Sequence, residues 1–425
     1  MTTSLRTPRS LTVALVAASL LLCAAALPAL RAQHVPPPDA APPPPLGLED
    51  CVRLGLERQP SLAAARASLA AAEAGQRALH NLHLAGVISR EVPIRREQAA
   101  LGVTIASAGL HQAEWETSYA VTRNYFSLMY AKKQEGVAEE VVRKLAFAQG
   151  TAKELLKKGK PDFKVQNYDI LKLAVHADLY RVRVAEAKHG MALASAALVE
   201  AIGLDGHGCL SLLQSDLPPP GEQLELCQLV DLALQRRGEM IQSASAVRVT
   251  ELEVDAQGTS LALTMRTFAA GSDVHAREIP QGVSNKEYRP SAIGLDMPTL
   301  LAGHRHDRME RARAFQARAA AVAEKTTNLI RLETEAAFLK WQDADRKARL
   351  LAGSLKSARE VAAGVKASFD IGLTTGEEYI RGITLADQAE AQYNEALYYH
   401  ALALAALERV TAGGYTPSFR QRRHP

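Results

Sequence analysis

Cysteine is scarce in this sequence, with four residues in 425. Cys23 lies in an N-terminal segment that we expect to be removed, so Cys51, Cys209 and Cys227 remain in the mature chain. Three thiols exclude a framework of several disulfides. Cys209 and Cys227 flank a proline-rich connector and could form one bridge, or they could remain two unpaired, small apolar residues. No CxxC pair occurs, and the sequence therefore predicts no zinc site.

A strong excess of charge of one sign is also missing. The formal net charge is +4, and the first 32 residues contribute three arginines and no acid. Without that segment the charge falls by three, to about +1. A chain with no strong basic field is not expected to bind nucleic acid.

Residue types that support catalysis are not grouped anywhere in the sequence. No glycine-rich phosphate loop is present, and residues 273–275 (Asp-Val-His), near Glu278, lack a nucleophile and a third partner. Residues 304–307 (His-Arg-His-Asp) hold two histidines beside an acid, but the start of a solvated helix is favoured there over a metal site. The sequence thus predicts no catalytic residue, no metal, no cofactor and no enzymatic activity.

The N-terminus has the layout of a secretory signal peptide. Arg6 and Arg9 precede an apolar run over residues 11–22, which is shorter than the roughly 20 residues of a transmembrane helix. Small residues continue to position 32, after which cleavage is expected. A lipid anchor on Cys23 is disfavoured because leucine precedes it, where a small residue is needed. These features predict export across the inner membrane to the cell envelope.

The stretch from Gly303 to Leu373 organises the chain. It contains no glycine or proline between positions 304 and 352, and strong helix formers dominate it. Its apolar residues recur every three or four positions, which indicates a heptad seam and a helix that supercoils against neighbours. A helix of roughly 65 residues would be roughly 100 Å long. The seam residues are Ala312, Phe315, Ala319, Val322, Thr326, Leu329, Trp341, Ala344, Ala348, Leu351, Leu355, Ala358, Ala362 and Val365.

A turn signature ends this long helix, and a second helical pattern runs back from it. Gly372 stands where the C-cap of a helix is expected, and residues 377–411 form the return helix. Ile371 and Leu373 flank this glycine at the tip. They could pack on each other and on the corresponding tip near Gly159, or they could be a docking surface.

The chain consists of two similar halves. Residues 54–62 resemble residues 232–240, and Gly159 corresponds to Gly372. A repeat of this size, far longer than a solenoid unit, indicates a duplicated helical module. The predicted fold class is mainly α, with very long antiparallel coiled-coil helical hairpins in two internal repeats and at most a short β-hairpin insertion.

The expected layout follows from these patterns. In the first half we expect helices at 49–82, 94–158 and 163–202. The proline-rich tract is either a stiff spacer or a disordered leader. The segments are a signal peptide (1–32), a Pro-rich linker (33–46), the first helical repeat (47–203), a linker (204–222), the second helical repeat (223–412, with a reduced β or loop insertion at 258–303) and a disordered tail (413–425).

This repeated layout resembles the TolC-type outer-membrane efflux protein family. The resemblance rests on the two similar openings, the paired long helices and the tip, and it covers nearly all of residues 46–412. It implies a homotrimer whose helices form a tunnel through the periplasm, a β-barrel in the outer membrane, and a periplasmic adaptor protein tied to an inner-membrane pump. The adaptor-docking positions that it implies are Ile371, Gly372, Leu373, Thr374 and Gly159. Lysines at 158 and 160 depart from the apolar pattern around Gly159.

Two features depart further from that family. Residues 261–268 have strand composition and residues 291–297 could return beside them, so at most one hairpin fits where the family has two strands in each half. The resemblance is therefore to a member with a strongly reduced β-barrel region, because six strands are too few for an open channel. The family also rings the constricted tip with carboxylates. Glu377 and Glu378 are the candidate gate, with Arg381 where another acid is usual.

Two hypotheses for function follow. The first is a trimeric, passive conduit of a tripartite efflux or type I secretion system in the periplasm and outer membrane. The alternative is a barrel-less, TolC-like coiled-coil protein of the periplasm that is structural or binds an adaptor. The pairs at 95–96 (Arg-Arg) and 132–133 (Lys-Lys) are interpreted as solvated faces.

Overall fold

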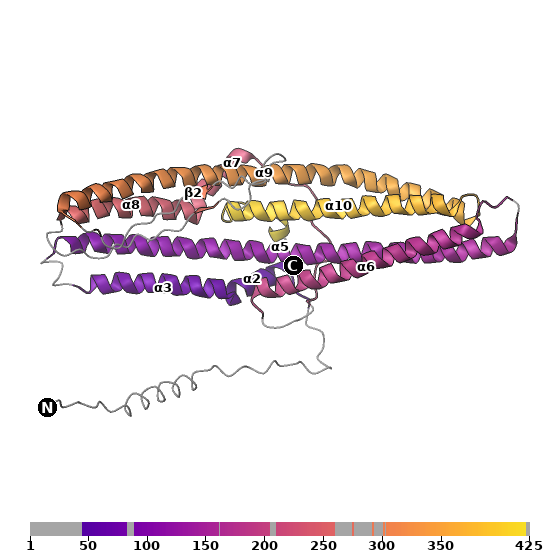
Figure 1. Ribbon diagram of the computed structural model, residues 1–425, viewed down its shortest axis with the longest axis horizontal. Helices are drawn as coiled ribbons and strands as arrows, with labels where there is room; N and C mark the ends of the chain where they lie inside the picture. The colour runs from indigo at the N-terminus through magenta and orange to yellow at the C-terminus, as the bar shows by residue number, and fades with distance from the viewer. Residues whose placement is uncertain are drawn as a thin grey trace, which may run out of the picture. The chain divides into compact units, whose positions relative to one another are not determined.

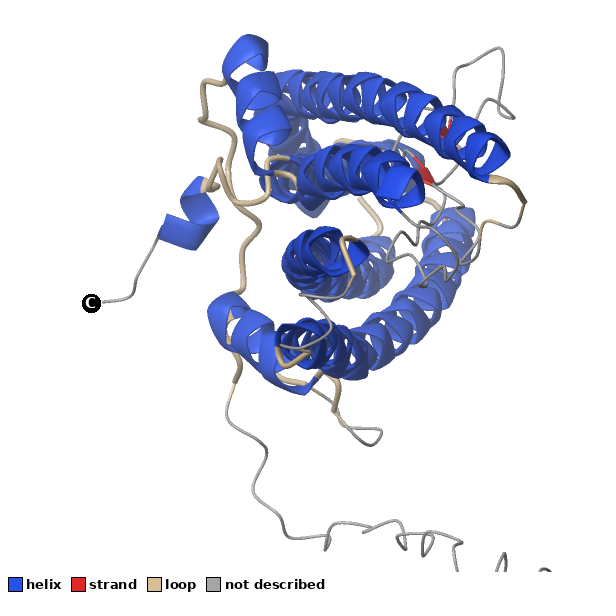
Figure 2. Cartoon of the chain, turned by 90° about the vertical axis from the view of Figure 1, so that its left-hand side faces the viewer, coloured by secondary structure: helices blue, strands red, loops and turns tan. Residues whose placement is uncertain are grey.

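The computed structural model describes residues 45–82, 89–160, 162–204, 210–259, 274–275, 291–292, 301 and 303–421. In these residues the chain is mainly helical, and the long helices run beside one another (Figure 1, and Figure 2, which looks along them). The expected signal peptide, most of the Pro-rich linker and Cys209 lie outside the described residues. The elements are α2 (Leu48–Arg58), α3 (Pro60–His80), α5 (Glu91–Lys158), α6 (Asn167–Ile202), α7 (Leu226–Arg236), α8 (Gly238–Thr259), β1 (Val274–His275), β2 (Ser291–Ala292), α9 (Arg305–Asp370), α10 (Gly376–Val410) and α11 (Ser418–Gln421).

The first half is built on a hairpin of two long helices. α5 has 68 residues and packs along α6, with α2 and α3 beside it. The single helix expected at 49–82 is two helices, because the chain turns to an extended conformation at Gln59 and Pro60 begins the next helix. The Gln59 Nε2 atom donates to the carbonyl of Glu200 at 3.3 Å, which ties this bend to the end of α6.

The second half repeats this plan. α9 has 66 residues and pairs with α10, while α7 and α8 pack against α9. The chain bends again at Arg237, just before Gly238, as it does at Gln59 in the first half. α8 and α10 also pack on α5, which joins the halves. A β-carbon on Gly238 would lie 2.5 Å from the carbonyl oxygen of Ala108, so glycine is required where α8 crosses α5.

The heptad seam of the long helix is confirmed. Every seam position of α9 is buried or half-buried, and Lys340, one residue before seam position Trp341, is exposed. The seam faces α10, α8 and α7. The predicted fold class, with long antiparallel helical hairpins in two repeats, is therefore the one observed.

Of the insertion at 258–303, the structure describes residues 258–259, 274–275, 291–292, 301 and 303. β1 and β2 pair antiparallel, with Val274 opposite Ala292 and His275 opposite Ser291. The strand expected at 261–268 and most of the expected return strand lie outside the described residues.

Residues 413–420, which were expected to be part of a disordered tail, instead pack on the helices. The Phe419 ring meets the Phe126 ring edge-on, with centroids 5.1 Å apart. The Arg420 guanidinium donates to Glu408 at 3.1 Å and to the Thr122 hydroxyl at 2.8 Å. An arginine and a phenylalanine inserted between α5 and α10 order this segment, whereas residues 422–425 lie outside the described part of the chain.

Candidate functional site at the paired hairpin tips

The tip of the first hairpin turns at Gly159. This glycine has φ 58° and ψ 28°, in the left-handed region, and it ends α5. The return helix was expected from residue 163, but α6 begins at Asn167. The reason is a capping box, in which the Gln166 side chain accepts from the third residue of the helix and the Asp169 carboxylate accepts from the Gln166 amide at 2.8 Å.

The tip of the second hairpin turns at Gly372, which has φ 79°. The amide of Leu373 donates to the carbonyl of Ser368 at 2.9 Å, which satisfies a carbonyl at the end of α9. Thr375 then caps α10, since its hydroxyl accepts from the Glu378 amide. Thr374 is buried, and its hydroxyl donates to the Glu378 carboxylate.

The two tips contact each other. The Lys164 amide donates to the carbonyl of Gly372 at 3.0 Å. A β-carbon on Gly372 would lie 2.6 Å from the Phe163 ring, and one on Gly376 would lie 2.7 Å from Asp169. Both glycines are therefore needed for the close approach of the hairpins, and the paired tips form one surface.

Ile371 and Leu373 project from this surface. Their side chains are 60% and 53% exposed, so the contact between the tips does not bury them. Phe163 fills the space behind Gly372 instead. Exposed apolar side chains on a turn that the other tip holds in place are available to a partner.

The candidate gate carboxylates are engaged in different ways. The Glu377 carboxylate forms ion pairs at 2.9 Å with Lys172 of α6 and at 2.9 Å with Arg381 of α10. The pKa of Glu377 is lowered, mainly by the hydrogen bond from Lys172. The same hydrogen bond raises the pKa of Lys172. Glu378 accepts from Thr374. Glu377 therefore links the two hairpins across a groove of about 570 Å³ that His176 also lines.

A buried polar contact that the sequence did not reveal joins α6 to α10 farther from the tip. The Tyr180 hydroxyl donates to the Asp387 carboxylate at 2.6 Å, and Arg183 approaches it at 3.3 Å. Burial raises the pKa of Asp387 and raises that of Tyr180 to about 12. Periodicity alone places both residues on apolar faces, and nothing in the sequence pairs them.

Two buried ionic clusters lie away from the tip. Arg95 is fully buried, although an arginine pair at 95–96 was expected to be solvated; Glu91 at 2.6 Å and Glu253 of α8 pair with it. The correction follows from the packing of α5 on α8, which brings Glu253 to Arg95. In the second cluster Glu333 of α9 pairs with two arginines, Arg237 and Arg409. A buried arginine needs such carboxylates to offset its desolvation.

Comparison with known proteins was made on sequence and on structure. No protein-family model and no curated protein sequence matches the chain. The structure is similar to the outer-membrane channel OprN, with a TM-score of 0.66 and 16% identity over 86% of this chain and 90% of that one. It is also similar to the outer membrane protein VceC from Vibrio cholerae, with a TM-score of 0.64 and 11% identity over 87% of this chain and 97% of that one. For the open state of the MtrE outer membrane channel from Neisseria gonorrhoeae the TM-score is 0.61, with 15% identity over 86% and 89% of the two chains.

At these low identities, the TM-scores show a shared fold alone. The chain has the fold of solved outer-membrane channels over most of its length, and the expected TolC-like architecture is confirmed. Among the helices that the structure describes, none is both long and apolar enough to cross a bilayer. The described residues also contain no cluster of three or more His, Cys, Asp and Glu side chains suited to a metal ion.

Proposed function

We propose that this chain is a passive conduit of the cell envelope, which works as a homotrimer with a periplasmic adaptor and an inner-membrane pump. The observation that carries the proposal is the exposed apolar pair Ile371 and Leu373, on a turn whose Gly372 packs against the Phe163 ring of the other tip. The fold shared with outer-membrane channels supports it. The alternative, a barrel-less coiled-coil protein of the periplasm that is structural or binds an adaptor, gains no support from these neighbours.

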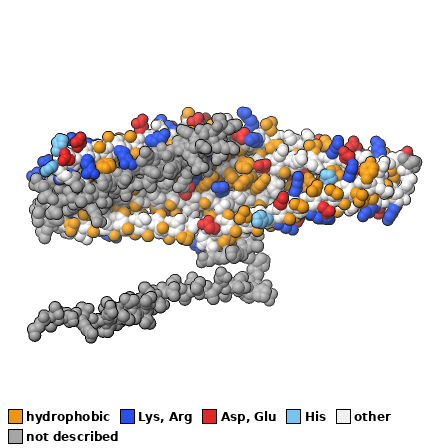
Figure 3. Space-filling view, in the orientation of Figure 1, with side chains coloured by type: hydrophobic (Ala, Val, Ile, Leu, Met, Phe, Trp, Pro, Cys, Tyr) orange, Lys and Arg blue, Asp and Glu red, His pale blue; other side chains and the backbone are white. Residues whose placement is uncertain are grey.

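Assembly with further copies is supported by an apolar stripe on α6. Its residues are three or four positions apart, so they share one face of the helix, and each is at least half exposed. Hydrophobic side chains are visible among Lys and Arg on this part of the surface in Figure 3. Monomers rarely leave such a stripe uncovered. We name as the α6 stripe the residues Tyr168, Leu171, Val175, Leu179 and Val182.

Light scattering of the purified chain should give the mass of three protomers. Leu179→Lys should shift the mass toward the monomer, because a charge in a desolvated interface costs several kcal/mol. Ala192→Lys adds the same charge at an exposed position of α6, about 100° around the helix from the stripe, and should leave the trimer intact. A wild-type chain that stays monomeric at micromolar concentration would contradict the assembly.

Leu373→Ser should leave folding and trimer formation unchanged, and should weaken adaptor cross-linking and export. The side chain is already 53% exposed, so its loss removes little core packing while removing an apolar contact for a partner. The control is Leu350→Ser, an exposed leucine of α9 about 30 Å from the tip. Normal export by Leu373→Ser with its adaptor present would mean that the tip is only a turn.

A further inference from the structure

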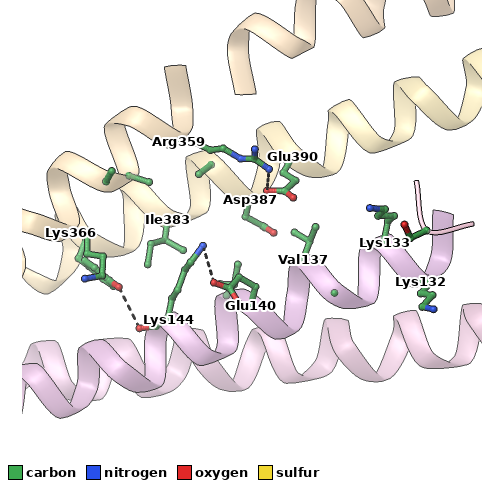
Figure 4. Close-up of a pocket in the computed structure, with 17 residues that line it drawn as sticks. Lys132, Lys133, Val137, Glu140, Lys144, Arg359, Lys366, Ile383, Asp387 and Glu390 are labelled. Atoms are coloured by element: carbon green, nitrogen blue, oxygen red, sulfur yellow. Dashed lines mark hydrogen bonds and ion pairs between the residues drawn. The ribbon is translucent and has the colours of Figure 1, made fainter. Parts of the chain in front are cut away.

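A groove of about 760 Å³ opens between α5, α9 and α10 (Figure 4). It lies where the apolar packing between the two hairpins is interrupted. One buried cluster includes Met129 of α5, and the next includes Val141 of the same helix. Between them stands Gly136, and a β-carbon there would meet no atom within 4 Å. The groove is also lined by small side chains of α9 and α10, which leave this space open. They are Ala362, Ala363 and Ala386.

The floor of the groove is apolar and its rim is cationic. Val137 and Ile383 lie on the floor. Five cations and three acids line the groove, which leaves an excess of two positive charges. The cations are Lys132, Lys133, Lys144, Arg359 and Lys366.

The three acids are already neutralised, in two cases by groups outside the groove. Glu140 accepts from Arg143 at 2.7 Å, and Arg183 pairs with Asp387 from α6. Glu390 pairs with Arg359 at 3.0 Å, as Figure 4 shows. Three of the rim lysines are also paired, Lys144 with Glu140 at 3.4 Å, Lys133 with Asp216 and Lys366 with Asp370 at 2.7 Å. Among the described residues, Lys132 is the rim cation that no carboxylate engages.

The size of the groove limits what it can hold. From Lys132 to Lys144 it follows twelve residues of α5, or about 18 Å. The volume is also within the roughly 300–1,000 Å³ of small-molecule sites.

We propose that this groove binds a single-chain anionic amphiphile, an alkyl carboxylate, with its chain on the apolar floor and its headgroup among the rim lysines. The alkyl chain covers Val137 and Ile383, and the carboxylate pairs with Lys132. This site is separate from the tip and does not depend on the proposed function.

Titration calorimetry of the full chain with dodecanoate, below its micellar concentration, tests the proposal. We expect saturable binding of one molecule per protomer. Dodecyltrimethylammonium has the same chain and the opposite charge, and should bind at least about tenfold more weakly. Lys132→Glu should weaken dodecanoate binding by about tenfold or more.

Filling the groove provides the second test. Gly136→Leu should abolish dodecanoate binding while the helix is retained, because leucine is a better helix former than glycine. Ala363→Leu fills the groove from α9, and circular dichroism of both variants confirms that they fold. Equal binding of both amphiphiles, or full binding by both filled variants, would overturn the proposal. So would an acidic helical peptide that binds the groove when dodecanoate does not.

Discussion

Leu355→Asp should lower the free energy of unfolding by roughly 3 kcal/mol or more. Leu355 is 7% exposed and packs with Ala358 and Ala389 where α9 meets α10. The substitution removes apolar packing and places a carboxylate in a desolvated seam. Thermal and denaturant unfolding, followed by circular dichroism, measure the change.

Lys356→Asp is the matched control, since it introduces the same residue one position along the same helix. Lys356 is exposed, and a surface substitution of this kind changes stability by about 0.5 kcal/mol or less. Similar losses for the two variants would show that the seam does not run through Leu355.

Glu333→Ala should be the second most damaging change, with a loss of about 3–5 kcal/mol. Glu333 is 3% exposed, and its two carboxylate oxygens accept separately from Arg237 and from Arg409, the latter at 2.7 Å. Without the Glu333 carboxylate, the buried guanidinium groups of Arg237 and Arg409 each lose one ion-pair partner. Arg237 retains Glu239, and Arg409 retains Glu116 at 2.9 Å, so the cluster is weakened rather than emptied.

The same carboxylate predicts a pH dependence. Burial by itself raises the pKa of Glu333, but the charges of Arg237 and Arg409 outweigh burial and hold it below its ordinary value. A lowered folded-state pKa contributes stability above the unfolded value of about 4.3, and this contribution is lost as the pH falls through the folded value. The difference in unfolding free energy between the wild type and Glu333→Gln should therefore be larger at pH 7 than at pH 3.

Denaturant titrations at the two pH values measure this difference. Glu333→Gln keeps the size of the side chain and removes its charge, so it isolates the ionic contribution. A difference that stays the same from pH 7 to pH 3 would show that Glu333 acts through packing alone.

The sequence determined the helices and their tips. The heptad spacing from Ala312 to Val365 sets which face of α9 is apolar, and burial against neighbours follows from that pattern. Gly159 and Gly372 could be recognised because a tight reversal after a long helix favours residues that adopt positive φ, as both do. The duplication was also visible in the sequence, since residues 54–62 resemble residues 232–240. The structure bends both halves within these segments, at Gln59 and Arg237.

The tertiary structure decided which side chains meet across helices. Lys172 and Glu377 are 205 residues apart in sequence, and Arg95 and Glu253 are 158 apart. Helical periodicity specifies the direction in which a side chain points, but not which other helix supplies its counter-ion. For that reason the sequence suggested a solvated Arg95, whereas packing buried it. The gate that the resemblance implies at Glu377 stays a prediction, and packing adds the ion pair of that carboxylate with Lys172. The groove beside Gly136 has the same origin, because a gap between two hairpins exists only once they are packed together.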